Sequence, residues 1–182
     1  MKKGAINKFL KKLYLPSQYS NFIERDNPSI IKSNDLLMII DMHSGYKTDF
    51  NEKDLKQTLE YQSSKIREAT ENDAEILFFY FGFTPFFKEL ISAVTTKQPI
   101  TLRKPKMDGF DGTSLEKILQ LKKPEIIHTM GCYAEACVAH TSISGKIKGY
   151  PIVIHRKGIL PSTDYGMQNA IRKYKIHKIP LI

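Results

Sequence analysis

The chain has 182 residues, of which 41% are hydrophobic and 26% are charged, as in an ordinary globular domain and unlike a disordered or fibrous protein. Two cysteines are too few for the disulfide framework of a small secreted protein, so we expect a reducing, cytoplasmic location. No apolar run approaches the ~20 residues that span a bilayer. The formal charge of +9 raises the question of nucleic acid, but the lysines are scattered and no nucleic-acid-binding motif occurs, so we expect no such partner.

The chain opens with a basic, amphipathic segment. Ile6, Phe9, Leu10 and Leu13 recur at helical spacing, with lysines between them. The segment lacks the continuous apolar core and small-residue cleavage site of a signal peptide. We expect residues 1–35 to be an N-terminal extension that packs on the domain formed by residues 36–182 or on a partner subunit. Binding to a membrane surface is the alternative, without stable insertion.

Apolar runs predict strands at residues 36–40, 75–83, 99–103, 125–130 and 150–155. The first run is unbroken and does not alternate with polar residues, which is typical of a central parallel strand buried on both faces. Between these runs the sequence predicts a helix after the N-cap Asn51, and others at residues 86–94, 115–121 and 164–174. Residues 131–141 form the turn into a further helix, which is expected to run to about residue 148. The alternation of strands and helices predicts a three-layer α/β/α sandwich with a mostly parallel sheet.

In such sheets ligands bind beyond the carboxyl ends of the strands, where the strand order reverses. Asp41 ends the first strand, Lys104 follows the third, and Cys137 follows the fourth. If the order is 3-2-1-4-5, the first and fourth strands are neighbours at this point. Asp41 and Cys137 would then face each other.

These residue types form a chemically coherent set. The first turn of a helix and a nearby ammonium group both lower the pKa of a cysteine, and a carboxylate can take the thiol proton. Cys132 lies nearer the strand end and is expected to be packed. Each residue also has an ordinary interpretation: a small buried cysteine, a capping aspartate and a solvated lysine.

Three sequence blocks carry a resemblance to a known family. Residues 36–46 read L-L-M-I-I-D-M-H-S-G-Y, an apolar run with an aspartate and a Gly-aromatic pair. Residues 104–113 place a lysine six positions before a phenylalanine, followed by Gly-Thr, and residues 131–138 place a glycine six positions before Cys-Val. In this order and spacing the blocks resemble the isochorismatase-like cysteine hydrolases, a group that includes nicotinamidases and N-carbamoylsarcosine amidase.

The resemblance implies a Rossmann-like hydrolase fold with a catalytic triad of Cys137, Asp41 and Lys104. Cys137 would attack a small amide, or a related C–N or C–O bond, and form a covalent intermediate. Asp41 would act as general base and acid, and Lys104 would hold the thiolate. The oxyanion hole would use the backbone N–H groups of Tyr133 and Cys137, beside a cis peptide bond between Cys132 and Tyr133. Relatives are commonly oligomers, so we expect a homo-oligomer that acts on a small molecule.

No cofactor or metal is expected. The nicotinamidases of this superfamily carry an Asp-x-His-x-x-x-His run after the second strand, whereas residues 79–86 here contain neither histidine nor carboxylate. The site wall would instead be aromatic, with Phe81, Phe83 and Phe86 among the candidates. For the substrate pocket the sequence suggests His43, Tyr80, Phe110 and Tyr133.

The chain also departs from the family pattern. Asp108-Gly109 stands where Ser-Ala is common, Ala134 replaces a threonine, and His43 replaces a glutamine. Asp108 could pair with Lys104 and compete with Cys137. The intact triad favours a hydrolase, whereas Asp108, Ala134 and the basic N-terminus leave open the alternative of a catalytically weak member that serves as a binding or assembly module. Of the other histidines, His128 is expected in the core, and His140 to be a packed or surface residue rather than a base.

Overall fold

The computed structural model describes residues 27–95 and 98–182. At its centre lies one sheet of five strands, β1 (Leu36–Ile40), β2 (Glu75–Tyr80), β3 (Ile100–Arg103), β4 (Ile127–Cys132) and β5 (Ile152–Leu160). All neighbouring strands pair in parallel, in the order β3-β2-β1-β4-β5. The predicted parallel sheet and its order are therefore confirmed.

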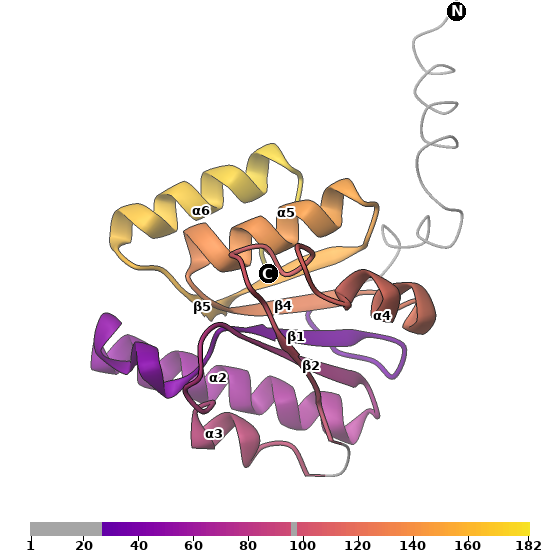
Figure 1. Cartoon of the computed structure of the whole chain (residues 1–182), viewed down its shortest axis with the longest axis horizontal. Helices are drawn as coiled ribbons and strands as arrows, with labels where there is room; N and C mark the ends of the chain where they lie inside the picture. Colours follow the sequence, from indigo (N-terminus) through magenta and orange to yellow (C-terminus); the bar gives the residue numbers. More distant parts are fainter. Residues whose placement is uncertain (1–26, 96–97) are drawn as a thin grey trace, which may run out of the picture.

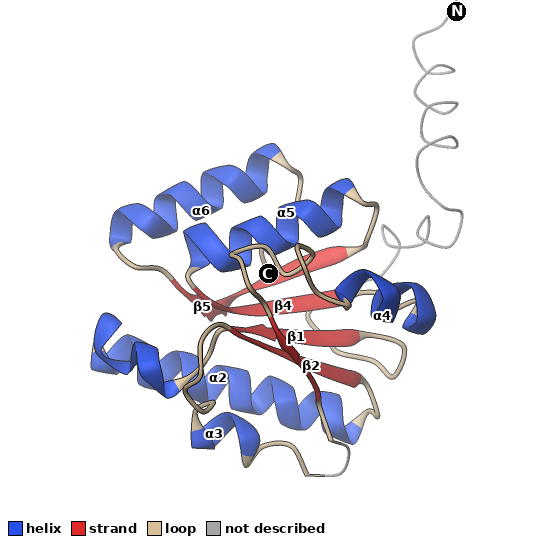
Figure 2. Ribbon diagram, in the orientation of Figure 1, coloured by secondary structure: helices blue, strands red, loops and turns tan. Residues whose placement is uncertain are grey.

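Helices cover both faces of the sheet, as Figure 2 shows. On one face lie α2 (Glu52–Glu71) and α3 (Lys88–Ile91); on the other lie α4 (Leu115–Lys122), α5 (Ala139–Ile147) and α6 (Asp164–Ile176) (Figure 1). Two short turns follow strands: the 3₁₀ turn η2 (Ser44–Asp49) after β1, and the π-helical turn η3 (Ala134–Val138) after β4. The three-layer α/β/α sandwich is confirmed.

The central strand β1 explains the unbroken apolar run in the sequence. All of its residues are buried, because it has a paired strand on each edge and helices on each face. Met38 and Ile40 pack toward α4, α5 and α6, whereas Leu37 and Ile39 pack toward α2 and α3.

Several element ends differ from the prediction. β2 ends at Tyr80 instead of residue 83, because Gly82 adopts a φ of +94° and the chain turns away. The helix expected at residues 86–94 is only the single turn α3. β4 continues to Cys132 and β5 to Leu160. The turn and further helix expected up to about residue 148 are η3 and α5.

Side-chain caps set the start of two helices. Asn51 accepts hydrogen bonds from the N–H groups of Lys53 at 2.9 Å and Asp54 at 3.4 Å, so the predicted N-cap of α2 is confirmed. Thr163 accepts a bond from Gly166 N–H at 3.0 Å at the start of α6. These caps satisfy N–H groups that have no partner inside the helix.

The predicted amphipathic helix near the N-terminus, and its packing, lie outside the described residues. The segment just before β1 packs on α2, since Ile31 is fully buried and its N–H donates to Glu68 Oε1 at 2.8 Å. Within residues 27–95 and 98–182, no helix has both the length and the apolar character needed to cross a membrane.

Candidate active site

Asp41, Lys104 and Cys137 meet at the carboxyl end of the sheet. Asp41 directly follows β1, Lys104 directly follows β3, and Cys137 lies in η3, which follows β4. The strand order places β1 and β4 side by side, at the point where the chain changes its direction of travel across the sheet. The three side chains, distant in sequence, come together as the strand order predicted.

Asp41 and Lys104 form a buried ion pair. Lys104 Nζ lies 2.7 Å from Asp41 Oδ2, and both side chains are 0% exposed. Lys104 Nζ also donates to the carbonyl of Lys106 at 3.2 Å, and it lies 5.1 Å from the ring centre of Phe81. Removing two charges from water is costly unless each has compensating contacts. The pair therefore marks this point as chemically distinct from the surrounding apolar core.

The Cys137 thiol lies near the Asp41 carboxylate and Lys104, since both groups act on its pKa, and the residue is 8% exposed. Burial raises the pKa of Cys137 to about 11; the charge of Asp41 raises it further, and Lys104 opposes both. The lowered thiol pKa expected from the sequence is wrong, because the site is deeply buried and Asp41 is adjacent. Burial also raises the pKa of Asp41, although Lys104 and Cys137 oppose this. The balance of these effects favours the protonated thiol over the thiolate in the resting site.

Cys132 has a packing role. Its Sγ donates to the backbone carbonyl of Asp41 at 3.1 Å, and the residue is buried. Burial raises the pKa of Cys132 well above its usual value. This matches the expectation that Cys132 is packed while Cys137 faces the acid.

The backbone between β4 and η3 has unusual geometry. The peptide bond between Cys132 and Tyr133 is cis, as the resemblance implied. Gly131 has a φ of +139°, and a Cβ atom there would lie 2.2 Å from the carbonyl oxygen of Ile40. Only glycine fits this approach of β4 to β1. Asp41 itself has a φ of +56°, a conformation that aspartate tolerates better than most residues.

His43 and Tyr133, two of the predicted pocket residues, lie beside this site. His43 is buried and shares a 2.6 Å hydrogen bond between its Nδ1 and Thr84 Oγ1. Burial lowers the pKa of His43 more than the Asp41 charge raises it, which favours a neutral ring. The half-buried Tyr133 donates its hydroxyl hydrogen to Asp49.

The other two predicted pocket residues make their contacts elsewhere. Tyr80 packs edge-on against Phe86, with ring centres 5.9 Å apart. Phe110 stacks on Tyr150 at 5.9 Å and packs over Gly145, near the end of α5 remote from Cys137. Eight residues of helix correspond to about 12 Å, so the structure does not bring Phe110 to Cys137.

The sequence reasoning missed part of the aromatic wall. The Tyr46 ring lies 4.2 Å from the His43 ring and 5.3 Å from the Tyr133 ring, and the Phe50 ring lies 5.3 Å from Tyr133. Burial, together with the nearby Asp41 and Cys137 groups, raises the pKa of Tyr46 to about 12. The Gly-aromatic pair Gly45-Tyr46 was the available signal, but only the path of η2 turns this ring toward the site.

Asp108 does not compete for Lys104. Its Oδ1 accepts the N–H of Phe110 at 2.9 Å, and its Oδ2 accepts the hydroxyl of Ser144. Nearby, Thr141 Oγ1 accepts the N–H of Gly109 at 2.8 Å. The expected pairing of Asp108 with Lys104 is therefore wrong, because this loop is anchored on α5 instead.

Beyond these residues, a groove of about 920 Å³ runs between α2 and the β5–α6 connection. Its lining includes Asp49 and Phe50 but none of Asp41, Lys104 and Cys137. In the part of the chain that the structure describes, no group of three or more His, Cys, Asp or Glu side chains is placed to hold a metal ion.

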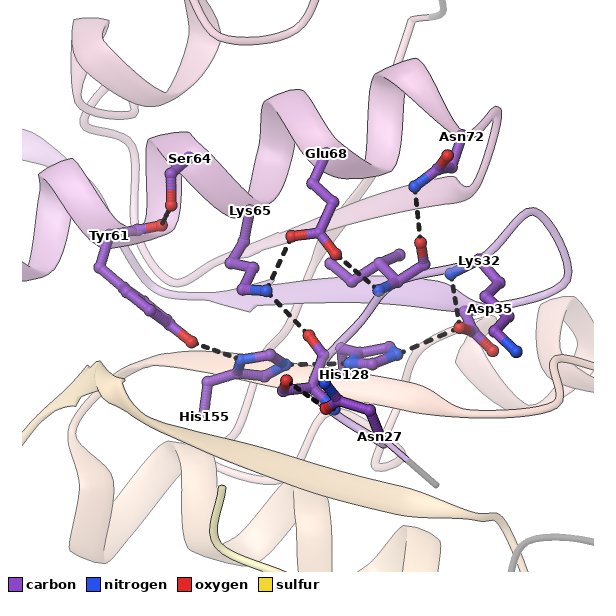
Figure 3. A network of polar contacts seen from close by, with 12 residues as sticks. Asn27, Lys32, Asp35, Tyr61, Ser64, Lys65, Glu68, Asn72, His128 and His155 are labelled. Carbon is purple, nitrogen blue, oxygen red and sulfur yellow. Dashed lines mark hydrogen bonds and ion pairs between the residues drawn. The ribbon is translucent and has the colours of Figure 1, made fainter. Parts of the chain in front are cut away.

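The histidines form a separate network (Figure 3). His128 Nε2 lies 3.2 Å from Asp35 Oδ2, His128 Nδ1 lies 2.9 Å from His155 Nε2, and His155 Nδ1 lies 2.9 Å from the Tyr61 hydroxyl. Both histidines are fully buried, which confirms His128 as a core residue with satisfied hydrogen bonds. His140 is exposed, as expected for a residue outside the site.

The geometry can be compared with known proteins. Residues 35–179 match the family described as the isochorismatase domain. Among curated proteins, the uncharacterized isochorismatase family protein PncA of Bacillus subtilis (strain 168) is 31% identical over 73 residues, which are 40% of this chain and 40% of that protein. The match therefore spans less than half of this relative's length.

Among solved structures, the nicotinamidase SaPncA from Staphylococcus aureus superposes with a TM-score of 0.71 at 19% identity, covering 82% of this chain and 98% of that chain. N-carbamoylsarcosine amidase from Thermoplasma acidophilum superposes with a TM-score of 0.70 at 16% identity, covering 83% of this chain and 95% of that chain. The MAR1 ribonuclease from Caenorhabditis elegans superposes with a TM-score of 0.73 at 15% identity, covering 84% of this chain and 79% of that chain. At such identities these similarities show a common fold.

Proposed function

The chain belongs to the isochorismatase-like hydrolase family, and from this premise we propose that it is a cysteine hydrolase. It cleaves a small amide, or a related C–N or C–O bond, through a covalent intermediate on Cys137 and without a metal. The observation that carries the proposal is the buried Asp41 carboxylate, which lies 2.7 Å from Lys104 Nζ and close enough to the Cys137 thiol to act on its pKa.

In the first half-reaction Asp41 takes the proton of the Cys137 thiol as Sγ attacks the carbonyl carbon. A tetrahedral oxyanion forms, and Asp41 then gives the proton to the leaving amine as the C–N bond breaks. A thioester remains on Cys137. The raised pKa of both groups suits this route, since the proton moves during attack and not beforehand.

In the second half-reaction water attacks the thioester while Asp41 accepts its proton. The C–S bond breaks, the carboxylic acid leaves, and the proton returns to the sulfur. Lys104 favours the charged form of the Asp41 carboxylate and so opposes the effect of burial, which favours the neutral acid. Because its ammonium is held against Oδ2, Lys104 also orients the carboxylate toward Cys137.

The developing oxyanion would be bound by the backbone N–H groups of Tyr133 and Cys137. Loss of one such donor typically costs ~10²-fold or more in rate. The substrate would lie beside His43, Tyr46 and Tyr133, with Phe81 above Lys104. Aromatic faces of this kind suit a small planar amide. The names of the neighbouring structures, a nicotinamidase and an N-carbamoylsarcosine amidase, also point to amide substrates.

Metal independence rests on the sequence of residues 79–86, which offers neither histidine nor carboxylate. We also propose a reducing, cytoplasmic environment, supported by two cysteines that remain free thiols. A homo-oligomer is proposed from the family resemblance alone. Light scattering on the purified chain measures the subunit number.

The direct test is hydrolysis of a panel of small aromatic and aliphatic amides, with release of ammonia or amine as the signal. Cys137→Ala is the null variant, and Cys132→Ala is the matched control with its buried thiol removed. We expect activity in the wild type and in Cys132→Ala, unchanged by chelators, and a thioester adduct on Cys137 by mass spectrometry.

Absence of turnover across the panel would favour the alternative, a family member that binds small molecules without cleaving them. Activity that persists in Cys137→Ala would remove the covalent mechanism. Activity abolished by chelators and restored by a divalent metal would remove metal independence.

A further inference from the structure

The turn that carries Cys137 is held from outside by helix α6. The Tyr174 hydroxyl donates to the backbone carbonyl of Ala134, and Lys173 Nζ donates to the carbonyl of Glu135 at 2.7 Å. Both carbonyls belong to η3. Tyr174 is 1% exposed and Ala134 is 0% exposed, so water does not compete for this bond.

The side chain of Glu135 makes a third contact, with the start of α6. Its carboxylate accepts the N–H of Ser162 at 3.0 Å and also the Ser162 hydroxyl. Gly166 permits the approach, because a Cβ atom there would lie 2.7 Å from Glu135 Oε1. The positive end of the helix dipole also favours a carboxylate here. One helix of 13 residues therefore holds the turn from both of its ends.

The π-helical turn η3 is wider than an α-helical turn. In η3 the N–H of Val138 reaches back five residues, to the carbonyl of Tyr133 at 3.1 Å, and such wide turns are rare and occur frequently at functional sites. The peptide groups of one helical turn point in nearly the same direction. Holding the carbonyls of Ala134 and Glu135 against α6 therefore also fixes the direction of the N–H groups in the turn.

We propose that Tyr174 and Lys173 are positioning residues, which hold η3 so that the thiol and N–H of Cys137 stay aligned with Asp41. The inference rests on the function proposed above. Neither residue touches the substrate; both act through the backbone of η3. Small errors in the placement of reacting groups have large effects on rate, since a displacement of about 1 Å can cost ~10²-fold.

The test uses Tyr174→Phe, which removes one hydroxyl, and Lys173→Met, which removes one ammonium. Tyr165→Phe and Lys175→Met are matched controls, because both residues lie exposed on the same helix. Lys173→Arg keeps a donor and serves as the rescue variant. Three quantities are measured in the full chain: amide hydrogen exchange of residues 134–139, the alkylation rate of Cys137 relative to Cys132, and kcat and KM for the best amide of the panel.

In both test variants we expect exchange in η3 and alkylation of Cys137 to rise, and kcat to fall at least ~10-fold, with KM changing less than ~3-fold. The controls should match the wild type, and Lys173→Arg should recover most of kcat. Wild-type exchange and kcat in both folded test variants would overturn the inference. A fall in kcat without faster exchange in η3 would overturn it too.

The two proposals fail separately. If the wild type hydrolyses no amide, the proposed function fails. Hydrogen exchange and alkylation then still test whether Tyr174 and Lys173 hold η3 in place. If Tyr174→Phe does not fold, Lys173→Met carries the decision, because Lys173 is only half-buried and its substitution leaves the core packing of Tyr174 intact.

Discussion

Lys104 Nζ lies 2.7 Å from Asp41 Oδ2, and neither side chain is exposed to solvent. The two residues come from different parts of the strand order, since Asp41 follows the central strand β1 and Lys104 follows the edge strand β3. Their ion pair therefore links the edge of the sheet to its centre at the candidate active site.

Removing one partner of this pair should destabilise the fold. Lys104→Ala leaves the Asp41 carboxylate buried without its counter-ion, which typically costs about 3–5 kcal/mol in the free energy of unfolding. Urea unfolding at pH 7.5 measures the loss. The control is Lys106→Ala, whose ion pair with Asp111 is exposed and should contribute little. Equal stability of the two variants would contradict the buried pair.

The reactivity of Cys137 should change in opposite directions when its two partners are removed. Asp41 raises and Lys104 lowers the pKa of Cys137, which lies at about 11 in the intact site. Asp41→Asn should therefore move the midpoint of alkylation to lower pH, whereas Lys104→Ala should move it to higher pH. Mass spectrometry of iodoacetamide adducts at fixed pH values between 8 and 10 tests this, with Cys132 as reference. Compared with the wild type, Cys137 should be alkylated faster in Asp41→Asn and more slowly in Lys104→Ala.

Asp41→Asn also separates thiol reactivity from catalysis. Amide hydrolysis should fall by ~10² or more, because the general base is lost, while alkylation at pH 8 becomes faster. Parallel loss of both properties would instead indicate that the substitution disrupts the site.

Stability should decrease in mild acid because of the buried His155. Burial, and the neighbouring His128, lower the pKa of His155 to about 3. The unfolded chain binds a proton near pH 6.5 and the folded chain does not, so this stability is complete above pH 6.5 and is lost as pH falls toward 3. One such group lowers the free energy of unfolding by about 2 kcal/mol between pH 6.5 and 5.

Urea unfolding at several pH values across this range gives the slope of the free energy of unfolding against pH. His155→Gln should flatten it, whereas His140→Gln, at an exposed position, should leave it unchanged. An identical slope in the wild type and His155→Gln would show that His155 is not the group responsible.

Gly131 should tolerate no side chain. Gly131→Ala places a Cβ atom 2.2 Å from the Ile40 carbonyl oxygen and adds strain at a positive φ, so the loss should exceed ~3 kcal/mol. Gly82→Ala is the matched control, since Gly82 has a φ of +94° but no atom within 4 Å of a Cβ. Its cost should stay near ~1 kcal/mol. Thermal and urea unfolding measure the loss of stability in each of the two variants relative to the wild type.

The sequence alone determined the layers of the fold and the residues expected at the candidate site, whereas the strand order was assumed from the usual order of such sheets and established by the structure. Local patterns were sufficient because an unbroken apolar run such as residues 36–40 requires neighbours on every side, and parallel strands bring their carboxyl ends to one edge. The N-cap Asn51 was also predicted from its immediate sequence neighbours. Element ends were less well predicted, because Gly82 and the division of residues 134–148 into η3 and α5 depend on packing.

Only the tertiary structure decided the environment of each group. Cys137 has a raised pKa because burial and Asp41 outweigh its place in a helical turn, and no sequence pattern reports how deeply a thiol is buried. Asp108 bonds to Ser144 instead of Lys104, and Phe110 packs on Tyr150, because α5 lies beside that loop. The support of η3 by Tyr174 joins segments 40 residues apart, a relationship that only the folded chain creates.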